Sequence, residues 1–431
     1  MKKMNLKDII ILGLMNFALF VGAGNIILPP FIGLQAGTSV WHAAIGFLLT
    51  GVGLPIITAI AMARVGGSLP EIVKPIGTFF STIIIIICYL CVGPLGATPR
   101  TATVAYSLGV KPFYDYNWLL LLYSFIFFIF VTCVSLYPQK LFETVGKFLS
   151  PIKILALIIL AVTVFILPAS APGTPLIAEP FAYGIKNGYL TMDTLAALVF
   201  GILIVGSIRS RNVYEPALIT RYAIYSGLIA GLALIIIYLS LFRLGTASTQ
   251  IATNAQDGAD VLAIYVHYSY GTLGNIFLGL LITIACLVTA IGLTCAGATY
   301  FNSLTGINYR ILVLIITGIS MLVSNLGLAQ LLKVSIPAMN AIYPVFIVLI
   351  FLSFINKKLH SPTLVATPLV IVALMFGLVD AATQIASEAI LPSFYKNLPL
   401  FNQGLAWLVP IICLSIICII VDILLGKKNK A

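Results

Sequence analysis

The sequence has 431 residues, of which 61% are hydrophobic and only 8% are charged. A water-soluble core cannot absorb that much apolar surface, so the solvent of this chain is expected to be a lipid bilayer. The formal net charge of +11 would indicate a nucleic-acid partner only if the basic residues clustered on a soluble face, and they do not cluster in that way.

Apolar runs of about 20 residues predict roughly twelve membrane-spanning helices. In chain order these predicted spans are 8–34, 42–63, 76–98, 118–137, 151–168, 193–208, 220–242, 274–300, 310–324, 334–355, 364–380 and 404–425. The longest polar connections, 169–192 and 244–273, leave no room for a large soluble domain. We therefore predict an all-α, polytopic membrane protein whose membrane domain carries the activity.

The basic residues indicate one orientation of these spans. With the N-terminus in the cytoplasm, seventeen of the 23 Lys and Arg residues fall in inner segments. The six in outer segments are Arg100, Lys111, Lys186, Arg243, Lys333 and Lys396. Cytoplasmic loops of membrane proteins carry such an excess, so both termini are predicted inside and the positive charge needs no nucleic acid to explain it.

The first span carries helix-breaking residues at its centre, in the stretch FVGAGNIILPP (20–30). Gly22, Gly24 and Asn25 precede Pro29 and Pro30, and proline removes a helix donor while glycine costs about 1 kcal/mol relative to alanine. Non-helical backbone at membrane depth survives only where it lines a cavity or ligand. The alternative is a kinked helix whose glycines permit close packing.

The sixth span, with Gly201 and Gly206 in a short apolar run, predicts a second interruption. Interrupted helices at corresponding positions of two halves indicate a secondary transporter with inverted repeats. Five spans in each half would insert the halves with opposite orientation. The predicted division is residues 8–168 (first repeat), 193–355 (second repeat) and 364–425 (two additional helices).

Such breaks have a defined chemistry. The N-terminal end of a half-helix suits a carboxylate, and freed carbonyls suit Na⁺ or an ammonium group. The eighth span adds hydroxyls at Thr289 and Thr294, although a threonine in a membrane helix often bonds the carbonyl one turn back.

The ionisable residues favour Na⁺ over a proton as coupling ion. All twelve acidic residues and the three histidines, His42, His267 and His360, map to loops or span ends, whereas proton relays use buried carboxylates or histidines. A pocket without side-chain charges would favour a zwitterionic substrate with an apolar side chain.

Several stretches resemble the bacterial branched-chain amino acid:cation symporters, the group that includes the BrnQ carriers. They are FALFVGAGNIILPPFIGLQAG, GFLLTGVGLPI, VGPLGATPRTATVAYSLGVKPF, YLTMDTLAALVFGILIV and QGLAWLVP. The resemblance implies cation-coupled uptake of leucine, isoleucine and valine, usually with Na⁺ and without another cofactor. It also implies the five-plus-five inverted-repeat (LeuT-like) fold of the amino acid–polyamine–cation superfamily.

Site residues follow from this resemblance. The substrate would bind at Gly22, Ala23, Gly24 and Asn25, with Phe200 and Gly201 opposite, while Asn25 could instead cap a helix. Na⁺ would lie among Ala18, Val21, Ala285, Cys286 and Thr289. The family often has two adjacent hydroxyl residues where this sequence has Val288 and Thr289, so one hydroxyl is missing.

Other classes fit less well. A membrane-embedded enzyme needs a convergent nucleophile, acid/base pair or metal set, and no such set is evident. A proton-coupled or passive carrier of other neutral amino acids on the same fold remains open. We expect a bacterial plasma-membrane protein whose partners are the amino acid, a monovalent cation and the bilayer, without an obligate protein partner.

Overall fold

The computed structural model describes residues 4–114, 116–137, 150–167, 170–385, 393–401 and 403–428. Within these ranges the chain is helical and contains no strand, which confirms the predicted fold class. Nine helical segments in the described chain are long and apolar enough to cross a membrane, and two shorter apolar helices accompany them. Residue 168, the predicted limit of the first repeat, and the acidic residues Asp115, Glu143 and Glu388 lie outside the described residues.

The first predicted span is two helices, as its glycines and asparagine indicate. Helix α1 (Leu6–Phe20) ends before Val21, and α2 (Ala23–Ala36) begins after Gly22. Val21 (φ −66°, ψ 89°) and Gly22 (φ −105°, ψ −163°) leave the helical region. Both prolines of the stretch lie inside α2, so they do not end it.

The third predicted span is also broken, and its predicted limit at residue 98 is wrong. Helix α6 (Thr78–Val92) is followed by a tight turn, and α7 (Ala97–Gly109) continues the span. A Cβ at Gly96 would lie 2.0 Å from the Cys91 carbonyl oxygen, so only glycine permits this turn.

The sixth span is interrupted before its predicted start. Helix α11 (Pro180–Tyr189) and helix α12 (Asp193–Arg209) are separated by residues 190–192. Met192 adopts φ 66° there, a left-handed conformation that is uncommon for a residue with a Cβ. The interruption predicted near Gly201 is therefore wrong, because α12 runs unbroken through that glycine.

The other predicted spans correspond to helices or near-continuous helical segments. The second contains α3 (Val40–Leu48), the π-turn η2 (Leu49–Gly53) and α4 (Leu54–Arg64). The rest are α8 (Asn117–Ser135), α10 (Ser150–Ile166), α13 (Pro216–Thr246), α14 (Gly258–Thr305), α15 (Tyr309–Ser324), α16 (Leu328–Ile355), α17 (Pro362–Ile385) and α19 (Leu408–Lys428). Short helices between them are η1 (Gly37–Ser39), α5 (Leu69–Val73), η3 (Lys74–Ile76), η5 (Asn356–Lys358) and α18 (Ser393–Lys396).

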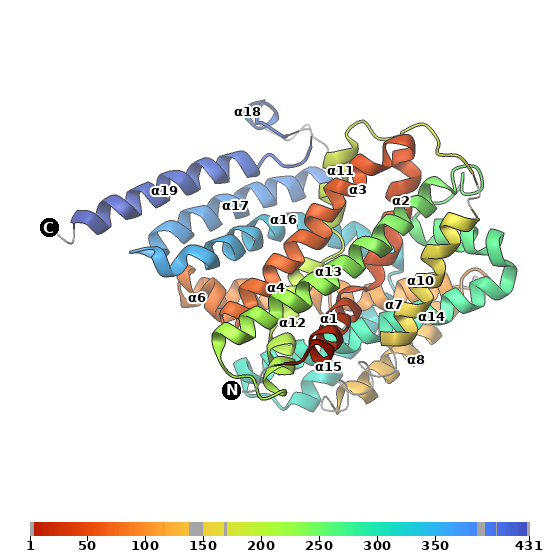
Figure 1. The fold of residues 1–431 in the computed structure, drawn as a ribbon, viewed down its shortest axis with the longest axis horizontal. Helices are drawn as coiled ribbons and strands as arrows, with labels where there is room; N and C mark the ends of the chain where they lie inside the picture. Colours follow the sequence, from red (N-terminus) through yellow and green to blue (C-terminus); the bar gives the residue numbers. More distant parts are fainter. Residues whose placement is uncertain are drawn as a thin grey trace.

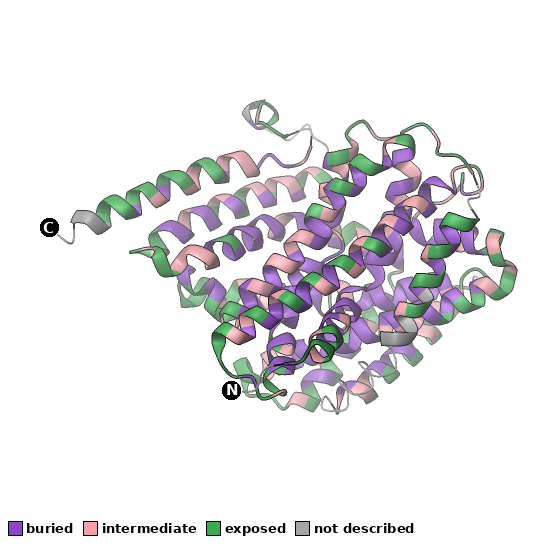
Figure 2. Ribbon diagram, in the orientation of Figure 1, coloured by how far each residue is buried: buried purple, intermediate pink, exposed green. Residues whose placement is uncertain are grey.

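The interrupted helices lie in the middle of the molecule. Helix α2 packs against α13 and α14, α7 packs against α14, and α12 packs against α4. Helices α16, α17 and α19 are side by side at the upper left of Figure 1, with α17 between the other two. Buried residues concentrate on the central helices, while α19 is largely exposed along its length (Figure 2). The helix breaks are therefore buried and the additional C-terminal helices are peripheral.

Candidate functional site

A small cavity lies where the breaks of the first and sixth spans meet α7 and α14. Its lining residues are Leu19, Phe20, Gly22, Ala23, Gly24, Asn25, Ala97, Arg100, Thr101, Thr191, Met192, Asp193, Ala196, Thr289 and Leu293. The cavity volume of about 30 Å³ accommodates water molecules but not an amino acid. An amino acid can therefore bind here only if the surrounding helices move apart.

Asn25 connects the two principal breaks. Its Oδ1 accepts a hydrogen bond from the Gly22 N–H at 3.0 Å, which satisfies a backbone donor left over by the break. Its Nδ2 donates to Asp193 Oδ2 at 2.5 Å and to the Tyr238 hydroxyl. Asn25 is thus the helix cap that the sequence suggested, and its buried amide also reaches the first residue of α12.

Asp193 lies at a span end, as predicted, but it overturns the inference drawn from this position that no acidic side chain is buried in the membrane domain. It is the first residue of α12, as its position at a span end requires, but its exposed fraction is only 2%. Since α11 lies on the other side of the break, this helix end is in the protein interior. Asn25 and Tyr238 donate to its carboxylate, the latter at 3.2 Å, and the N-terminal dipole of α12 adds favourable electrostatics.

Arg100 overturns the prediction that this residue belongs to an outer loop. It lies in α7 with an exposed fraction of 2%. Its Nη1 donates to the carbonyl of Leu190 at 2.7 Å, in the break between α11 and α12. A Cβ at Gly24 would lie 3.1 Å from Arg100 Nη2, so the guanidinium faces the start of α2. The cavity therefore contains opposite side-chain charges, contrary to the prediction of an uncharged pocket.

The structure brings together part of the predicted cation set. The Thr289 hydroxyl lies 3.5 Å from the Val21 carbonyl oxygen and 3.4 Å from that of Ala285, and it lines the cavity. Ala18 and Cys286 are fully buried on the same two helices, α1 and α14. Neutral oxygens at the end of a half-helix are suited to a monovalent cation. Thr294 is buried one to two turns further along α14 and is not among the lining residues.

Phe200 and Gly201 lie away from the cavity lining. The Phe200 ring packs against the ring of Phe20, which does line the cavity, with 6.5 Å between ring centroids. Gly201 faces α4, where a Cβ would lie 2.5 Å from the Met62 Cε. The small residue at 201 permits close packing of α12 against α4, and α12 continues unbroken through it.

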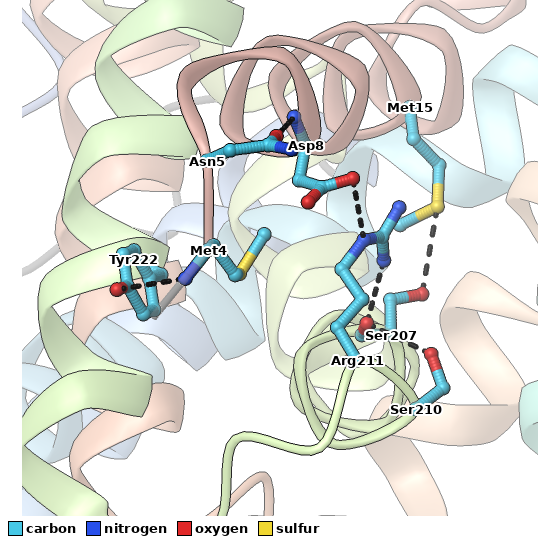
Figure 3. A network of polar contacts seen from close by, with 8 residues as sticks. All are labelled: Met4, Asn5, Asp8, Met15, Ser207, Ser210, Arg211 and Tyr222. Carbon is cyan, nitrogen blue, oxygen red and sulfur yellow. Dashed lines mark hydrogen bonds and ion pairs between the residues drawn. The ribbon is translucent and has the colours of Figure 1, made fainter. Parts of the chain in front are cut away.

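A second polar network joins the start of α1 to the end of α12 (Figure 3). Arg211 Nε lies 3.9 Å from Asp8 Oδ1, and its Nη1 donates to the Ser207 carbonyl at 2.6 Å. The backbone N–H of Met4 donates to the Tyr222 hydroxyl at 3.1 Å. These contacts hold the N-terminal segment against α12 and α13 at one end of the interrupted helices.

Comparison with known protein families identifies the chain. Residues 5–425 match the family model described as branched-chain amino acid transport protein. The chain belongs to this family. It is accordingly a transporter and not an enzyme, and its family is one of polytopic membrane proteins.

Curated relatives of this transporter match over nearly their whole length. It is 52% identical to the branched-chain amino acid transport system 3 carrier protein of Pseudomonas aeruginosa, over 98% of each chain. It is 49% identical to the branched-chain amino acid permease BrnQ of Escherichia coli K12, over 98% of this chain and 97% of that one.

Solved structures support the fold of the transporter. The nucleobase-cation-symport-1 family transporter Mhp1 matches with a TM-score of 0.62 at 15% identity, over 97% of this chain and 93% of that one. The manganese transporter of Eremococcus coleocola, in complex with an aromatic bis-isothiourea substituted compound, matches with a TM-score of 0.59 at 14% identity, over 96% and 94%. At such identities the likeness concerns the fold alone, and it confirms the LeuT-like architecture.

Sequence reasoning missed Arg100 and Asp193 as cavity residues of this transporter. Both belong to stretches that carry the family resemblance, PRTATV (99–104) and YLTMD (189–193). Charged residues inside a membrane domain are usually functional. Their presence in those two motifs is the signal that would have found them.

Proposed function

We propose that this transporter carries out uptake of leucine, isoleucine and valine by symport with Na⁺ and alternating access. The observation that carries the proposal is that both helix breaks meet at one buried cavity. The Thr289 hydroxyl, which lies near the carbonyl oxygens of Val21 and Ala285, lines the same cavity. Ligands that share a cavity can stabilise the same conformation, which is the requirement for coupling. The relatives named as branched-chain amino acid carriers support the substrate class.

The lining of the cavity also supports an aliphatic substrate. Leu19, Phe20, Ala97, Ala196 and Leu293 supply apolar surface, while Arg100 and Asp193 supply one charge of each sign. A zwitterion matches this balance, and a substrate with net charge leaves one buried charge unmatched. We therefore still propose a zwitterionic amino acid with an apolar side chain as substrate. The support is now a pair of opposite side-chain charges, whereas the sequence argument assumed a pocket with none.

Proton coupling is the second candidate, and the buried Asp193 favours it. The sequence argument against protons relied on the absence of buried acids, and that premise does not hold in the structure. Buried carboxylates are the usual elements of proton relays. The neutral oxygens of Val21, Ala285 and Thr289 are the observation that still favours Na⁺.

The interrupted helices support a division into two repeats, with one adjustment. We propose that the first repeat begins near residue 8 and that the second begins at Pro180, because α11 is the first half of its interrupted helix. The bias of basic residues supports a plasma-membrane location with both termini in the cytoplasm.

Purified protein in liposomes provides the test. Labelled leucine uptake is measured with an inward Na⁺ gradient, a Li⁺ gradient, a proton gradient and no gradient. Accumulation above the outside concentration with Na⁺ alone supports the proposal, and competition by isoleucine and valine but not by lysine or aspartate supports the substrate class. Accumulation with the proton gradient alone favours the second candidate, and equilibration without accumulation under every gradient overturns both.

A further inference from the structure

Arg100 is the one residue of the cavity whose buried polar atoms are left without partners by the described structure. Its Nη1 donates to Leu190, but among the described residues neither Nε nor Nη2 has a hydrogen-bond acceptor. A buried guanidinium with unmade hydrogen bonds is costly. The bond to Leu190 accounts for one nitrogen of the guanidinium and leaves the other two buried nitrogens unexplained by the described residues.

This guanidinium lies against the start of α2, and the unpartnered Nη2 is its atom nearest to the place of a Cβ at Gly24. A Cβ at Gly24 would lie 3.1 Å from Nη2 and 3.3 Å from Cζ, so any other residue would crowd the guanidinium, and the glycine avoids this. Two planar N–H groups match the geometry of a carboxylate, which arginine binds bidentately. A carboxylate in the cavity would satisfy the atoms that the protein leaves unmatched.

Asp193 lines the same cavity but does not neutralise Arg100 directly. Within the described residues no ion pair joins the two side chains. The Asp193 carboxylate is held instead by Asn25 on α2 and Tyr238 on α13. Separated opposite charges in one enclosed cavity are complementary to a molecule that carries both charges itself.

We propose that Arg100 binds the carboxylate of the transported amino acid and that Asp193 is the counter-charge for its ammonium group. This inference rests on the proposed function, since it requires an amino acid as substrate. It assigns recognition of both charged groups to side chains on α7 and α12. The backbone of the first-helix break then has the role of leaving space for them.

The test uses three ligands of similar size: leucine, leucinamide, which lacks the carboxylate, and 4-methylpentanoate, which lacks the ammonium group. Their affinities are obtained from the thermal stabilisation of purified protein. We expect the wild-type protein to bind leucine more tightly than either analogue. In Arg100→Met the affinity for leucine should fall by roughly 30-fold or more, while the affinity for leucinamide should change little. Arg100→Lys, which keeps the charge but not the fork, should retain part of the preference for leucine.

Asp193→Asn is the reciprocal variant. Its affinity for leucine should fall while that for 4-methylpentanoate is retained. Arg221→Met, which removes an arginine with an exposed, cavity-distant side chain on α13, is the matched control and should behave as wild type.

The outcomes separate the two proposals. Wild-type protein that binds leucine and leucinamide equally, or Arg100→Met that keeps the wild-type ratio between them, overturns this inference and leaves the proposed function intact. If size-exclusion chromatography shows the Arg100 variants to be misfolded, the ratio of the wild-type affinities for leucine and leucinamide alone decides. Wild-type protein that binds none of the three ligands overturns the proposed function and this inference together.

Discussion

Asn25 Nδ2 donates to Asp193 Oδ2 at 2.5 Å, and this bond joins the break of the first span to the break of the sixth. The same side chain caps the Gly22 N–H, so one buried amide fixes both the local shape of the first break and its distance from α12. Movement of α2 relative to α12 must carry this bond along or break it. The amide therefore couples the two helices that alternating access would move.

Replacement of Asn25 should weaken substrate binding. Asn25→Ala removes one hydrogen bond from the buried Asp193 carboxylate and leaves the Gly22 N–H without its acceptor, a loss of about 1–3 kcal/mol. We expect the apparent affinity for leucine in proteoliposome uptake to fall about 5- to 150-fold. Asn25→Asp should be worse, because it places a second carboxylate against Asp193. Asn254→Ala, at an exposed loop position, serves as control, and an unchanged affinity in Asn25→Ala would refute the coupling role.

Gly24 should tolerate even a methyl group poorly. In Gly24→Ala the new Cβ would lie 3.1 Å from Arg100 Nη2 and 3.3 Å from Nη1, so the guanidinium must shift away from the break. We expect a several-fold loss of leucine affinity in Gly24→Ala and no detectable binding in Gly24→Leu, with membrane insertion intact for both. Gly206→Ala is the matched control, because a Cβ there meets nothing within 4 Å. Wild-type binding by Gly24→Leu would move the site elsewhere.

The first break was predictable because its residues are poor helix formers in an apolar run. Gly22, Gly24 and Asn25 each disfavour a continuous membrane helix, and the structure places the break at Val21 and Gly22, with Gly24 and Asn25 in the first turn of α2. The break of the sixth span has no such mark. Leu190, Thr191 and Met192 contain neither glycine nor proline, and the left-handed conformation of Met192 is imposed by the tertiary structure.

Gly201 misled the prediction for a related reason. The sequence alone does not distinguish a glycine that allows two helices to pack closely from a glycine at which a helix unwinds. The close contact with Met62 on α4 shows that Gly201 belongs to the first kind.

Arg100 was misplaced because residues 97–109 contain too many hydroxyls and too few large apolar side chains for a span criterion based on hydropathy. That helix is polar because it faces the cavity and α14, and only a structure shows what it faces.

Thr289 is expected to set the cation requirement of transport. Thr289→Val keeps the shape of the side chain and removes the hydroxyl that lies near Val21 and Ala285. The Na⁺ concentration for half-maximal leucine uptake should rise about tenfold, as for loss of one buried hydrogen-bonding ligand, while the maximal rate at saturating Na⁺ changes less. Thr289→Ser should retain the wild-type requirement.

Thr294→Val is the matched control for this prediction. Thr294 is buried on the same helix, and its hydroxyl has no hydrogen-bond partner among the described residues. Removal of that hydroxyl should leave the Na⁺ requirement unchanged. If the Na⁺ requirement rises equally in both valine variants, the substitutions affect α14 in general. If it rises in neither variant, the cation binds elsewhere.

Arg211 should hold the N-terminal end of α1 closed against α12. Its contact with Asp8 is 3.9 Å long and partly exposed, with side-chain exposed fractions of 26% and 38%, so the ion pair contributes at most about 1 kcal/mol. Arg211→Met should therefore raise the population in which this end of α1 is detached from α12 by up to about fivefold. The measure is the labelling rate of Ser207→Cys by a water-soluble maleimide, with the seven native cysteines replaced.

The charge exchange Asp8→Arg with Arg211→Asp should restore slow labelling, because attraction between the two positions is retained. Lys74→Met is the control, since it breaks the exposed pair between Lys74 and Glu71, which lies outside the network of Figure 3. Equal acceleration in the control would assign the effect to net charge. Unchanged labelling in Arg211→Met would show that the bond from Met4 to Tyr222 and apolar packing hold α1 without the ion pair.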